Sequence, residues 1–409
     1  MVVRKAYLVP FLSACIILCL SIYLENRSFI LGSVAALIFL LFTANKFRFS
    51  AISICLVTMG FTGLILVLAL AVKSASTHGR ILIYKVSAGI FREHYLWGLG
   101  LGNFKKQYLH YQAAYFERGN YSEQELLLAG NTYYAFNDYW QFMLEWGVFG
   151  GVVLLLAISS IVYMIHKVLS SADRTNTAFL TGCVLLMTIA VAACFNHVFE
   201  RVYIQIVFLL SLSVIVWGFA KQWIKNRVFY FACVLLGVFM LLTAEFGHKI
   251  IAREAYHQWR EANSLRRMGY FNQAFHNFEV AYPYLQADAS FLRDYAEMMM
   301  SARRFHEAIE IFEQALPHWV GHRMYMSLGT CYHQVGRYDE AERTFLKSVY
   351  MVPNRFESRF ALFTYYIETD RKEEASYWGK SIMELPVKVP SARVDMIRKD
   401  VQRLLMEIK

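Results

Sequence analysis

Gly336-Arg337-Tyr338-Asp339-Glu340-Ala341 is one of four related stretches that decide the fold of the C-terminal part of the chain. The other three are Gly269-Tyr270-Phe271-Asn272-Gln273-Ala274, Arg303-Arg304-Phe305-His306-Glu307-Ala308 and Asp370-Arg371-Lys372-Glu373-Glu374-Ala375. The final alanines of consecutive stretches lie 34, 33 and 34 positions apart. That spacing is the period of tetratricopeptide repeats, in which every repeat is a helical hairpin.

Two further signals agree with this period. The third repeat carries Leu328-Gly329-Thr330-Cys331-Tyr332, which matches a pattern in the first helix of such repeats. Prolines are expected to end three of the second helices, namely Pro317, Pro353 and Pro386. We therefore predict an α-solenoid of about four hairpins over residues 248–409, closed by a capping helix over 391–409. Its groove is either a site for a protein partner or the unoccupied surface of a scaffold.

The residues before position 248 have the composition of a membrane protein. The whole chain is 57% hydrophobic, with a mean hydropathy of +0.35. A helix needs about 20 apolar residues to cross a bilayer. Seven segments are predicted to span it: Ala6–Leu24, Phe29–Ala44, Ala51–Val72, Phe142–His166, Thr177–Phe195, Val202–Ala220 and Val228–Phe246. The second is short, so a re-entrant and a tilted segment both remain open for it. The predicted fold is all-α, with a polytopic membrane domain over residues 1–247 followed by the repeats.

The short basic connectors predict the orientation, because such connectors remain on the cytoplasmic side. Counted alternately along the spans, four groups share one face: Arg4 and Lys5; Lys46 and Arg48; His166, Lys167 and Arg174; and Lys221, Lys225 and Arg227. A large loop at residues 73–141, a short loop at 196–201 and the repeats then lie outside. Much of the net charge of +10 thus follows from topology.

Composition also argues against several classes of function. The C-terminal part mixes acidic and basic residues almost evenly, so a nucleic-acid partner has little support. No CxxC or HxxxH spacing indicates a metal, and no cofactor is expected. A transporter is expected to carry charged residues at mid-membrane, and the predicted spans are almost free of charge.

The two outer loops hold the residues with the most chemical interest. Alternating glycines run through Gly98-Leu99-Gly100-Leu101-Gly102 and allow either a tight path against a ligand or a plain turn. Arg80 lies just beyond the third predicted span, where a guanidinium either binds a phosphate or anchors to lipid headgroups. The short loop contains His197 and Arg201. His197 is a candidate general base, whereas Glu200 and Arg201 equally fit an interfacial salt bridge.

At these residues the chain resembles the O-antigen ligase/polymerase family of bacterial envelope glycosyltransferases. The family pattern is an arginine followed by an aromatic residue, a GxGxGxF stretch, a long periplasmic loop, and an HN-x-[YF]-[LW]-[QE] segment leading into ExGxxG. The matching residues here are Arg80, Tyr84, Gly98, Gly100, Gly102, Phe104, Asn137, Tyr139, Trp140, Gln141, Glu145, Gly147 and Gly150. The resemblance covers about residues 80–219, and a periplasmic repeat tail also resembles members of this superfamily.

The resemblance implies transfer of a glycan from an undecaprenyl-pyrophosphate donor to a hydroxyl group at the periplasmic face of the inner membrane. The acceptor is then lipid A-core, a polysaccharide or a protein. Cationic groups stabilise a pyrophosphate leaving group, so Arg80, Arg201 and His197 are the expected catalytic residues. The expected substrate-binding residues are Gly98, Gly100, Gly102, Phe104, Asn137, Asp138, Tyr139, Gln141 and Glu145.

Two features depart from the family pattern. Phe136 occupies the place of the histidine that often precedes the asparagine, so His197, Asp138 or Glu145 would have to act in its place. The family normally has roughly ten to twelve spans, and about seven are predicted here. A short family member, a version truncated at the N-terminus and a non-catalytic relative remain open. The rival function, from a different class, is a membrane-anchored repeat scaffold for envelope assembly.

Overall fold

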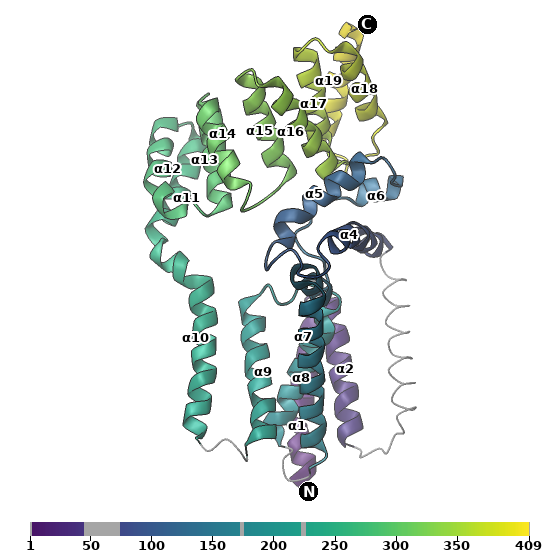
Figure 1. Cartoon of the computed structure of the whole chain (residues 1–409), viewed down its shortest axis with the longest axis vertical. Helices are drawn as coiled ribbons and strands as arrows, with labels where there is room; N and C mark the ends of the chain where they lie inside the picture. Colours follow the sequence, from purple (N-terminus) through teal and green to yellow (C-terminus); the bar gives the residue numbers. More distant parts are fainter. Residues whose placement is uncertain (1, 45–73, 172–175, 222–225, 409) are drawn as a thin grey trace. The chain divides into compact units, whose positions relative to one another are not determined.

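The computed structural model describes residues 2–44, 74–171, 176–221 and 226–408, and every regular element within them is an α-helix (Figure 1). The chain forms two compact units. Unit 1 comprises residues 1–77, 94–100 and 134–248, and unit 2 comprises residues 78–93, 101–133 and 249–409. Unit 1 ends at residue 248, one position after the predicted boundary, and two pieces of the 73–141 segment belong to the unit that contains the repeats.

Unit 1 contains the apolar helices. They are α1 (Val2–Tyr23), α2 (Arg27–Ala44), α7 (Asp138–Leu169), α8 (Thr177–Ala193), α9 (Val202–Ala220) and α10 (Arg227–Ile251). All but α8 are long and apolar enough to cross a membrane, and α8 is an apolar helix of 17 residues. These six helices correspond to six of the seven predicted spans. The other span, Ala51–Val72, lies outside the described residues, as do Lys46, Arg48, Arg174 and Lys225.

Small residues let α2 and α8 pack closely. A Cβ added at Gly32 would lie 2.4 Å from the carbonyl oxygen of Thr188. Ser33 and Ala36, on the same helix as Gly32, are fully buried. Small side chains at a helix contact allow the backbones to approach, which is a common way to pack helices within a bilayer. Helix α8 therefore lies in the interior of unit 1, with Leu180 fully buried.

The outward faces of the same unit are apolar. On α7, Val153, Leu155 and Leu156 each expose more than half of their surface. On α10, Leu235 and Phe239 do the same. A soluble protein rarely exposes such contiguous apolar surface, whereas a bilayer covers it. Unit 1 is thus a multi-pass membrane unit.

Unit 2 contains the repeat array. Its hairpins are α11 (Arg253–Met268) with α12 (Phe271–Leu285), α13 (Ala289–Ser301) with α14 (Phe305–Ala315), α15 (His322–Gln334) with α16 (Tyr338–Met351), and α17 (Phe356–Glu368) with α18 (Lys372–Glu384), followed by α19 (Ala392–Ile408). Figure 1 shows these pairs following one another along the array. The four period-setting alanines are all fully buried: Ala274, Ala308, Ala341 and Ala375. The predicted repeats, the capping helix and the helix ends before Pro317, Pro353 and Pro386 are confirmed.

Each hairpin turns through a left-handed residue five positions before its buried alanine. Two repeats place glycine there, Gly269 and Gly336, with φ of 87° and 78°. The other two place Arg303 and Asp370, with φ of 59° and 54°. Left-handed backbone is easy for glycine and strained for residues with a Cβ. The geometry of the turn is therefore the same in all four repeats, although the residue is not.

The segment predicted as a large loop at 73–141 is largely helical. It holds α4 (Ser74–Glu93), α5 (Phe104–Glu117) and α6 (Glu123–Leu128), and α7 begins at Asp138. Helix α6 starts with a capping box, in which the Ser122 hydroxyl accepts from the Glu125 amide and Glu125 accepts from the Ser122 amide. Glu125 also forms an ion pair with Lys85 of α4 at 2.8 Å. These contacts order the segment, so the connection between the predicted spans contains helices of its own.

Helices α5 and α6 pack against the repeat array. Helix α5 lies beside α16 (Figure 1). The side-chain amide of Asn354, in the turn between α16 and α17, donates to the carbonyls of Leu126, Leu127 and Ala129 at 3.1, 2.8 and 2.7 Å. Carbonyls at the C-terminal end of a helix have no partner within the helix. Asn354 therefore caps α6 from a distant part of the chain.

Further contacts extend this docking along the turns between repeats. Gln112 of α5 donates to the carbonyls of Gly130 and Met351. The Nδ1 of His322 lies 3.0 Å from the Asn131 side-chain oxygen, and burial, with the charges of Arg355 and Arg323, lowers the pKa of His322 to about 4. The imidazole is therefore neutral at pH 7, and its Nδ1–H tautomer donates to Asn131. Residues 101–133 and the array thus form one packed unit.

We expect Asn354→Ala to loosen this docking without unfolding the array. The substitution leaves three helix-end carbonyls without their donor, which costs about 1–3 kcal/mol. Backbone amides of residues 123–131 should then exchange with deuterium about 10- to 100-fold faster in the full-length protein. Asn272→Ala is the matched control, since Asn272 is exposed. Equal exchange in the two variants would show that Asn354 does not hold α6.

Candidate functional site

A break in α7 and the glycine turn of residues 95–100 form the first part of the candidate site. Gly147 has φ 65° and ψ −164° inside α7, so the helical hydrogen bonds are interrupted there. The turn supplies the missing partners. The amides of Leu99 and Gly100 donate to the carbonyls of Leu144 and Glu145, both at 2.9 Å, and the amide of Val148 donates to the carbonyl of Tyr95 at 2.8 Å. The turn and the broken helix therefore stabilise each other.

Close backbone packing explains two of the glycines. Gly98 has φ 73°, and a Cβ added to it would lie 2.3 Å from the carbonyl carbon of Glu145. A Cβ added to Gly147 would lie 2.2 Å from the carbonyl oxygen of Leu96. Gly100 and Gly102 also have positive φ, 87° and 71°, and no atom lies within 4 Å of a Cβ built on Gly102. Gly98 faces the α7 backbone, and this contact accounts for it without a ligand.

The polar residues at the start of α7 hold that region together. The Asn137 side chain accepts from the amide of Trp140 at 2.9 Å and so caps the helix. Asp138 accepts from the amides of Val198 and Phe199 at 2.8 and 3.3 Å. Asn137 orders the helix start, and Asp138 fastens the 196–201 loop to it. Asp138 is therefore a positioning group for the loop that carries His197.

Three more residues of the motif have partners within unit 1. Tyr139 donates to the carbonyl of Ala190 at 2.9 Å. Gln141 accepts from the amide of Ala135 at 3.2 Å and donates to Glu145 at 3.3 Å. Glu145 is only 5% exposed. These predicted substrate-binding residues therefore also support the local structure.

His197 lies between two aromatic rings. Its imidazole stacks on Tyr134 with ring centroids 4.1 Å apart and an interplanar angle of 4°. Phe136 meets it edge-on at 5.3 Å. The Tyr134 hydroxyl donates to Glu200 at 3.2 Å. Phe136 stands where the family pattern often has histidine, so His197 supplies an imidazole beside that place.

The protonation state of His197 suits a base. Burial, together with the charge of Arg201, lowers the pKa of His197 below its ordinary value, although Glu200 acts in the opposite direction. The imidazole is therefore neutral at pH 7. Its Nδ1 is buried and has no hydrogen-bond partner within the part of the chain that the structure describes. A neutral imidazole can accept a proton from a hydroxyl group that reaches an accessible ring nitrogen.

The remaining predicted residues are distributed over both units. Arg201 precedes α9 and its guanidinium donates to the Tyr203 hydroxyl at 2.6 Å, in an exposed position of unit 1. Arg80 is half-buried within α4, and it belongs to unit 2 together with Gly102 and Phe104. Phe104 is fully buried and its ring lies 5.2 Å from that of Tyr108, so core packing accounts for it.

Comparison with known proteins agrees with this arrangement. Residues 4–155 match the O-antigen ligase family, and residues 256–319 and 322–355 match tetratricopeptide repeats, the first of them of the YpiA-like C-terminal type. The chain combines a region similar to the O-antigen ligase family with tetratricopeptide repeats. No curated protein matches it at a significant level.

The motifs predicted that the resemblance to O-antigen ligases covers about residues 80–219. The family match covers a different range. The match begins at residue 4 and ends at residue 155. It includes Arg80 and the motifs up to Gly150, whereas the loop with His197 lies beyond it. Sequence reasoning did not identify Tyr134, the stacking partner of His197, because neither residue lies in a pattern that links the two. The similarity of residues 4–155 to O-antigen ligases suggests a role in glycan transfer.

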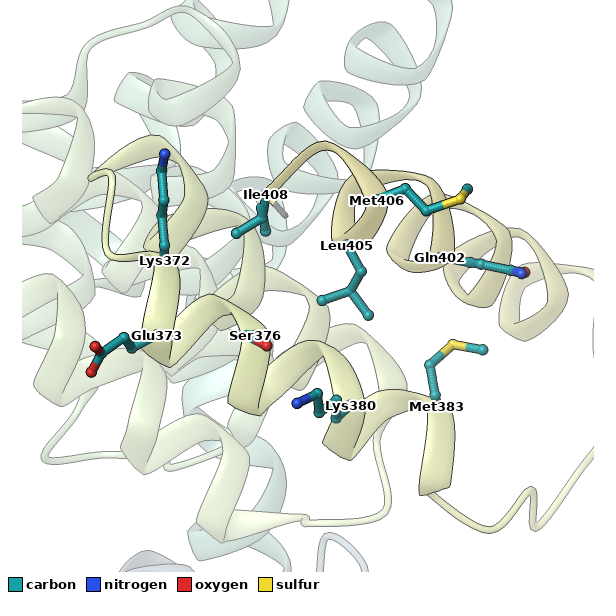
Figure 2. A pocket seen from close by; sticks show the side chains of 9 residues that line it. All are labelled: Lys372, Glu373, Ser376, Lys380, Met383, Gln402, Leu405, Met406 and Ile408. Carbon is teal, nitrogen blue, oxygen red and sulfur yellow. The ribbon is translucent and has the colours of Figure 1, made fainter.

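Among the described residues, neither a metal-ligand cluster nor the hollow at α18 and α19 contributes to this site. No cluster of three or more potential metal ligands occurs among the described residues. A hollow of about 650 Å³ lies between α18 and α19. Figure 2 shows Met383, Leu405 and Met406 at this hollow, with Lys372 and Lys380 on α18. None of the predicted site residues lines it.

Proposed function

We propose that the chain transfers a glycan from an undecaprenyl-pyrophosphate-linked donor to a hydroxyl group at the periplasmic face of the bacterial inner membrane. The acceptor is lipid A-core, a polysaccharide or a protein. In unit 1, the observation that carries the proposal is the neutral imidazole of His197, which the 196–201 loop holds against Tyr134. The O-antigen ligase match and the apolar helices support the same reading.

The proposed reaction is a direct displacement. His197 takes the proton of the acceptor hydroxyl, and the acceptor oxygen forms a bond to the anomeric carbon of the donor sugar. The bond from that carbon to the pyrophosphate oxygen breaks with inversion, and undecaprenyl pyrophosphate leaves with the bonding electrons. Arg80, and secondly Arg201, stabilise the charge that develops on the leaving oxygens. No nucleotide takes part.

The proposal requires that residues 73–141, 196–201 and the repeats lie in the periplasm, where the lipid-linked donor is presented. Three of the four basic groups that predict this orientation include residues outside the described part of the chain. The orientation is therefore part of the proposal. The repeat array would then lie on the same side as the reaction, where an acceptor or protein partner is recruited.

Arg80→Ala is expected to reduce surface glycan at least about 100-fold, because removal of one transition-state charge donor commonly costs 100- to 1,000-fold. The variant is expressed in a host strain that lacks the gene, and surface glycan is quantified after electrophoresis. Arg92→Ala is the matched control, since Arg92 is an exposed arginine of the same helix. Protein level is followed by immunoblot, so that loss of glycan is separated from loss of protein.

The rival function is a non-catalytic membrane-anchored scaffold for polysaccharide assembly. It is favoured by the hydrogen bonds that Asn137, Asp138 and Gln141 form within the chain, because these bonds explain the polar residues without a substrate. A scaffold predicts normal surface glycan in Arg80→Ala and loss of glycan when residues 249–409 are removed. Loss in Arg80→Ala at normal protein level contradicts it.

A further inference from the structure

A second pocket lies within unit 2, where the end of α5 and the α6 region meet the repeat array. It has a volume of about 350 Å³, within the range of about 300–1,000 Å³ typical of small-molecule sites. Residues 116–126 form one wall, and α17, α18 and the turn at Pro353 form the other. The docked segment and the array therefore create a hollow that neither forms alone.

Aromatic and polar groups share the lining of this pocket. Its aromatic side chains are Phe116, Tyr121, Tyr350, Tyr377 and Trp378. The Tyr377 ring meets Trp378 edge-on at 5.4 Å and is 67% exposed. A pyranose ring has apolar C–H faces that pack on aromatic rings and hydroxyl groups that bond to polar side chains. A lining of this kind matches a sugar ring better than a purely apolar ligand.

Arg359 supplies a buried cation in the same pocket. It is 7% exposed, its Nε donates to the carbonyl of Pro353 at 3.0 Å, and its Nη1 donates to Ser381. The guanidinium carbon lies 5.6 Å from the centroid of the Trp378 ring. Nη2 makes no hydrogen bond to any described residue, and no carboxylate of the described chain forms an ion pair with Arg359. A buried charge is costly without an anionic partner.

Two glutamates also line the pocket, and their charges act on a bound ligand more weakly than the charge of Arg359. Glu117 and Glu384 are exposed, so water screens their charges, whereas Arg359 is enclosed. Both are able to accept hydrogen bonds from sugar hydroxyls. The pocket thus offers one enclosed cation and several neutral or hydroxyl-accepting groups.

We infer that this pocket binds an acidic sugar of the glycan that the chain handles, with the ring on Tyr377 and Trp378 and the carboxylate on Nη2 of Arg359. The inference rests on the proposed function for the identity of the glycan as substrate. A carboxylate pairs with a guanidinium through short, charge-assisted hydrogen bonds. The site would hold a uronic-acid residue of the chain being transferred or extended, apart from the residues assigned to the reaction.

The test uses the full-length protein in nanodiscs and ligand-observed saturation-transfer NMR titrations. The probes are tetragalacturonate, maltotetraose, which has the same length and linkage type without carboxylates, and tetraglutamate. Tetragalacturonate should bind at least about tenfold more tightly than either of the other two, because only it combines sugar rings with carboxylates. Equal binding of maltotetraose or of tetraglutamate overturns the inference, and so does absence of binding.

Variants locate the binding. Tyr377→Ala should weaken tetragalacturonate binding about tenfold, and its exposed ring makes misfolding a small risk. Arg359→Gln should abolish the preference over maltotetraose, because it removes the charge that pairs with the carboxylate. Tyr284→Ala is the control, because Tyr284 is 61% exposed on α12 and does not line the pocket. Unchanged binding in Tyr377→Ala contradicts the assignment. Binding is measured without catalysis, so a negative result here leaves the outcome of Arg80→Ala unaffected.

Discussion

Replacing His197 by phenylalanine should reduce the rate of glycan transfer at least about 100-fold while the protein still accumulates in the membrane. A positioned general base commonly contributes 100- to 10,000-fold. The phenylalanine ring keeps the stacking on Tyr134 and removes the nitrogen that would accept the proton. The measurement is transfer from a purified lipid-linked donor to acceptor, with protein amount and thermal unfolding followed in parallel.

The pH dependence of the transfer rate gives a second test of the role of His197. Because the pKa of His197 is lowered from its ordinary value, the imidazole is neutral above about pH 6.5. The wild-type rate should be constant above that pH as far as this group is concerned, and should fall as the pH drops through the lowered pKa. His248→Phe, at an exposed position of α10, is the control. An unchanged rate in His197→Phe would exclude His197 as the base.

Gly98→Ala should destabilise unit 1 by about 3–5 kcal/mol, which is enough to deplete the folded protein. The new Cβ would lie 2.3 Å from the carbonyl carbon of Glu145, and that atom belongs to backbone that cannot move aside easily. The positive φ of Gly98 adds strain for any residue with a Cβ. Protein level and the thermal unfolding midpoint in membranes are the measurements.

Gly102→Ala separates the two causes of this loss. Gly102 has nearly the same φ, 71°, and no atom within 4 Å of its built Cβ. Only the strain of left-handed backbone is added there, at a cost of about 1–2 kcal/mol. If the two variants unfold at the same temperature, the contact between Gly98 and Glu145 is not what requires glycine.

The helices and repeats could be predicted because their signals are local. The apolar run Val202–Ala220 predicted α9 with the bounds that the structure has. The spacing of the buried alanines predicted the hairpins, since each small residue marks a place where two helices approach. The start of α7 at Asp138 was missed, because the polar residues before Phe142 interrupt the apolar run that predicted the span.

The docking of α5 and α6 could not be predicted in the same way. It depends on side-chain amides such as Asn354, which reaches the carbonyl of Ala129 from 225 positions away. No periodicity or motif links two such residues. The sequence predicted a groove that is either a site for a protein partner or the unoccupied surface of a scaffold. It did not indicate the pocket around Arg359.

The candidate site was predicted in part. The motif identified Asn137 and Gly98, which order the start of α7 and the turn beside its break. It did not reveal that Phe136 adopts φ 53° and meets His197. That contact forms because two loops lie close together in the fold, and no local sequence pattern indicates such proximity.

The capping of α6 by Asn354 has a consequence for the construction of hybrid proteins. A graft that exchanges only residues after 248 between related chains would separate the asparagine from the carbonyls that it caps. The unit that can be exchanged is therefore discontinuous in sequence. Residues 101–133 have to be exchanged together with the repeats if the contacts between α6 and Asn354 are to remain.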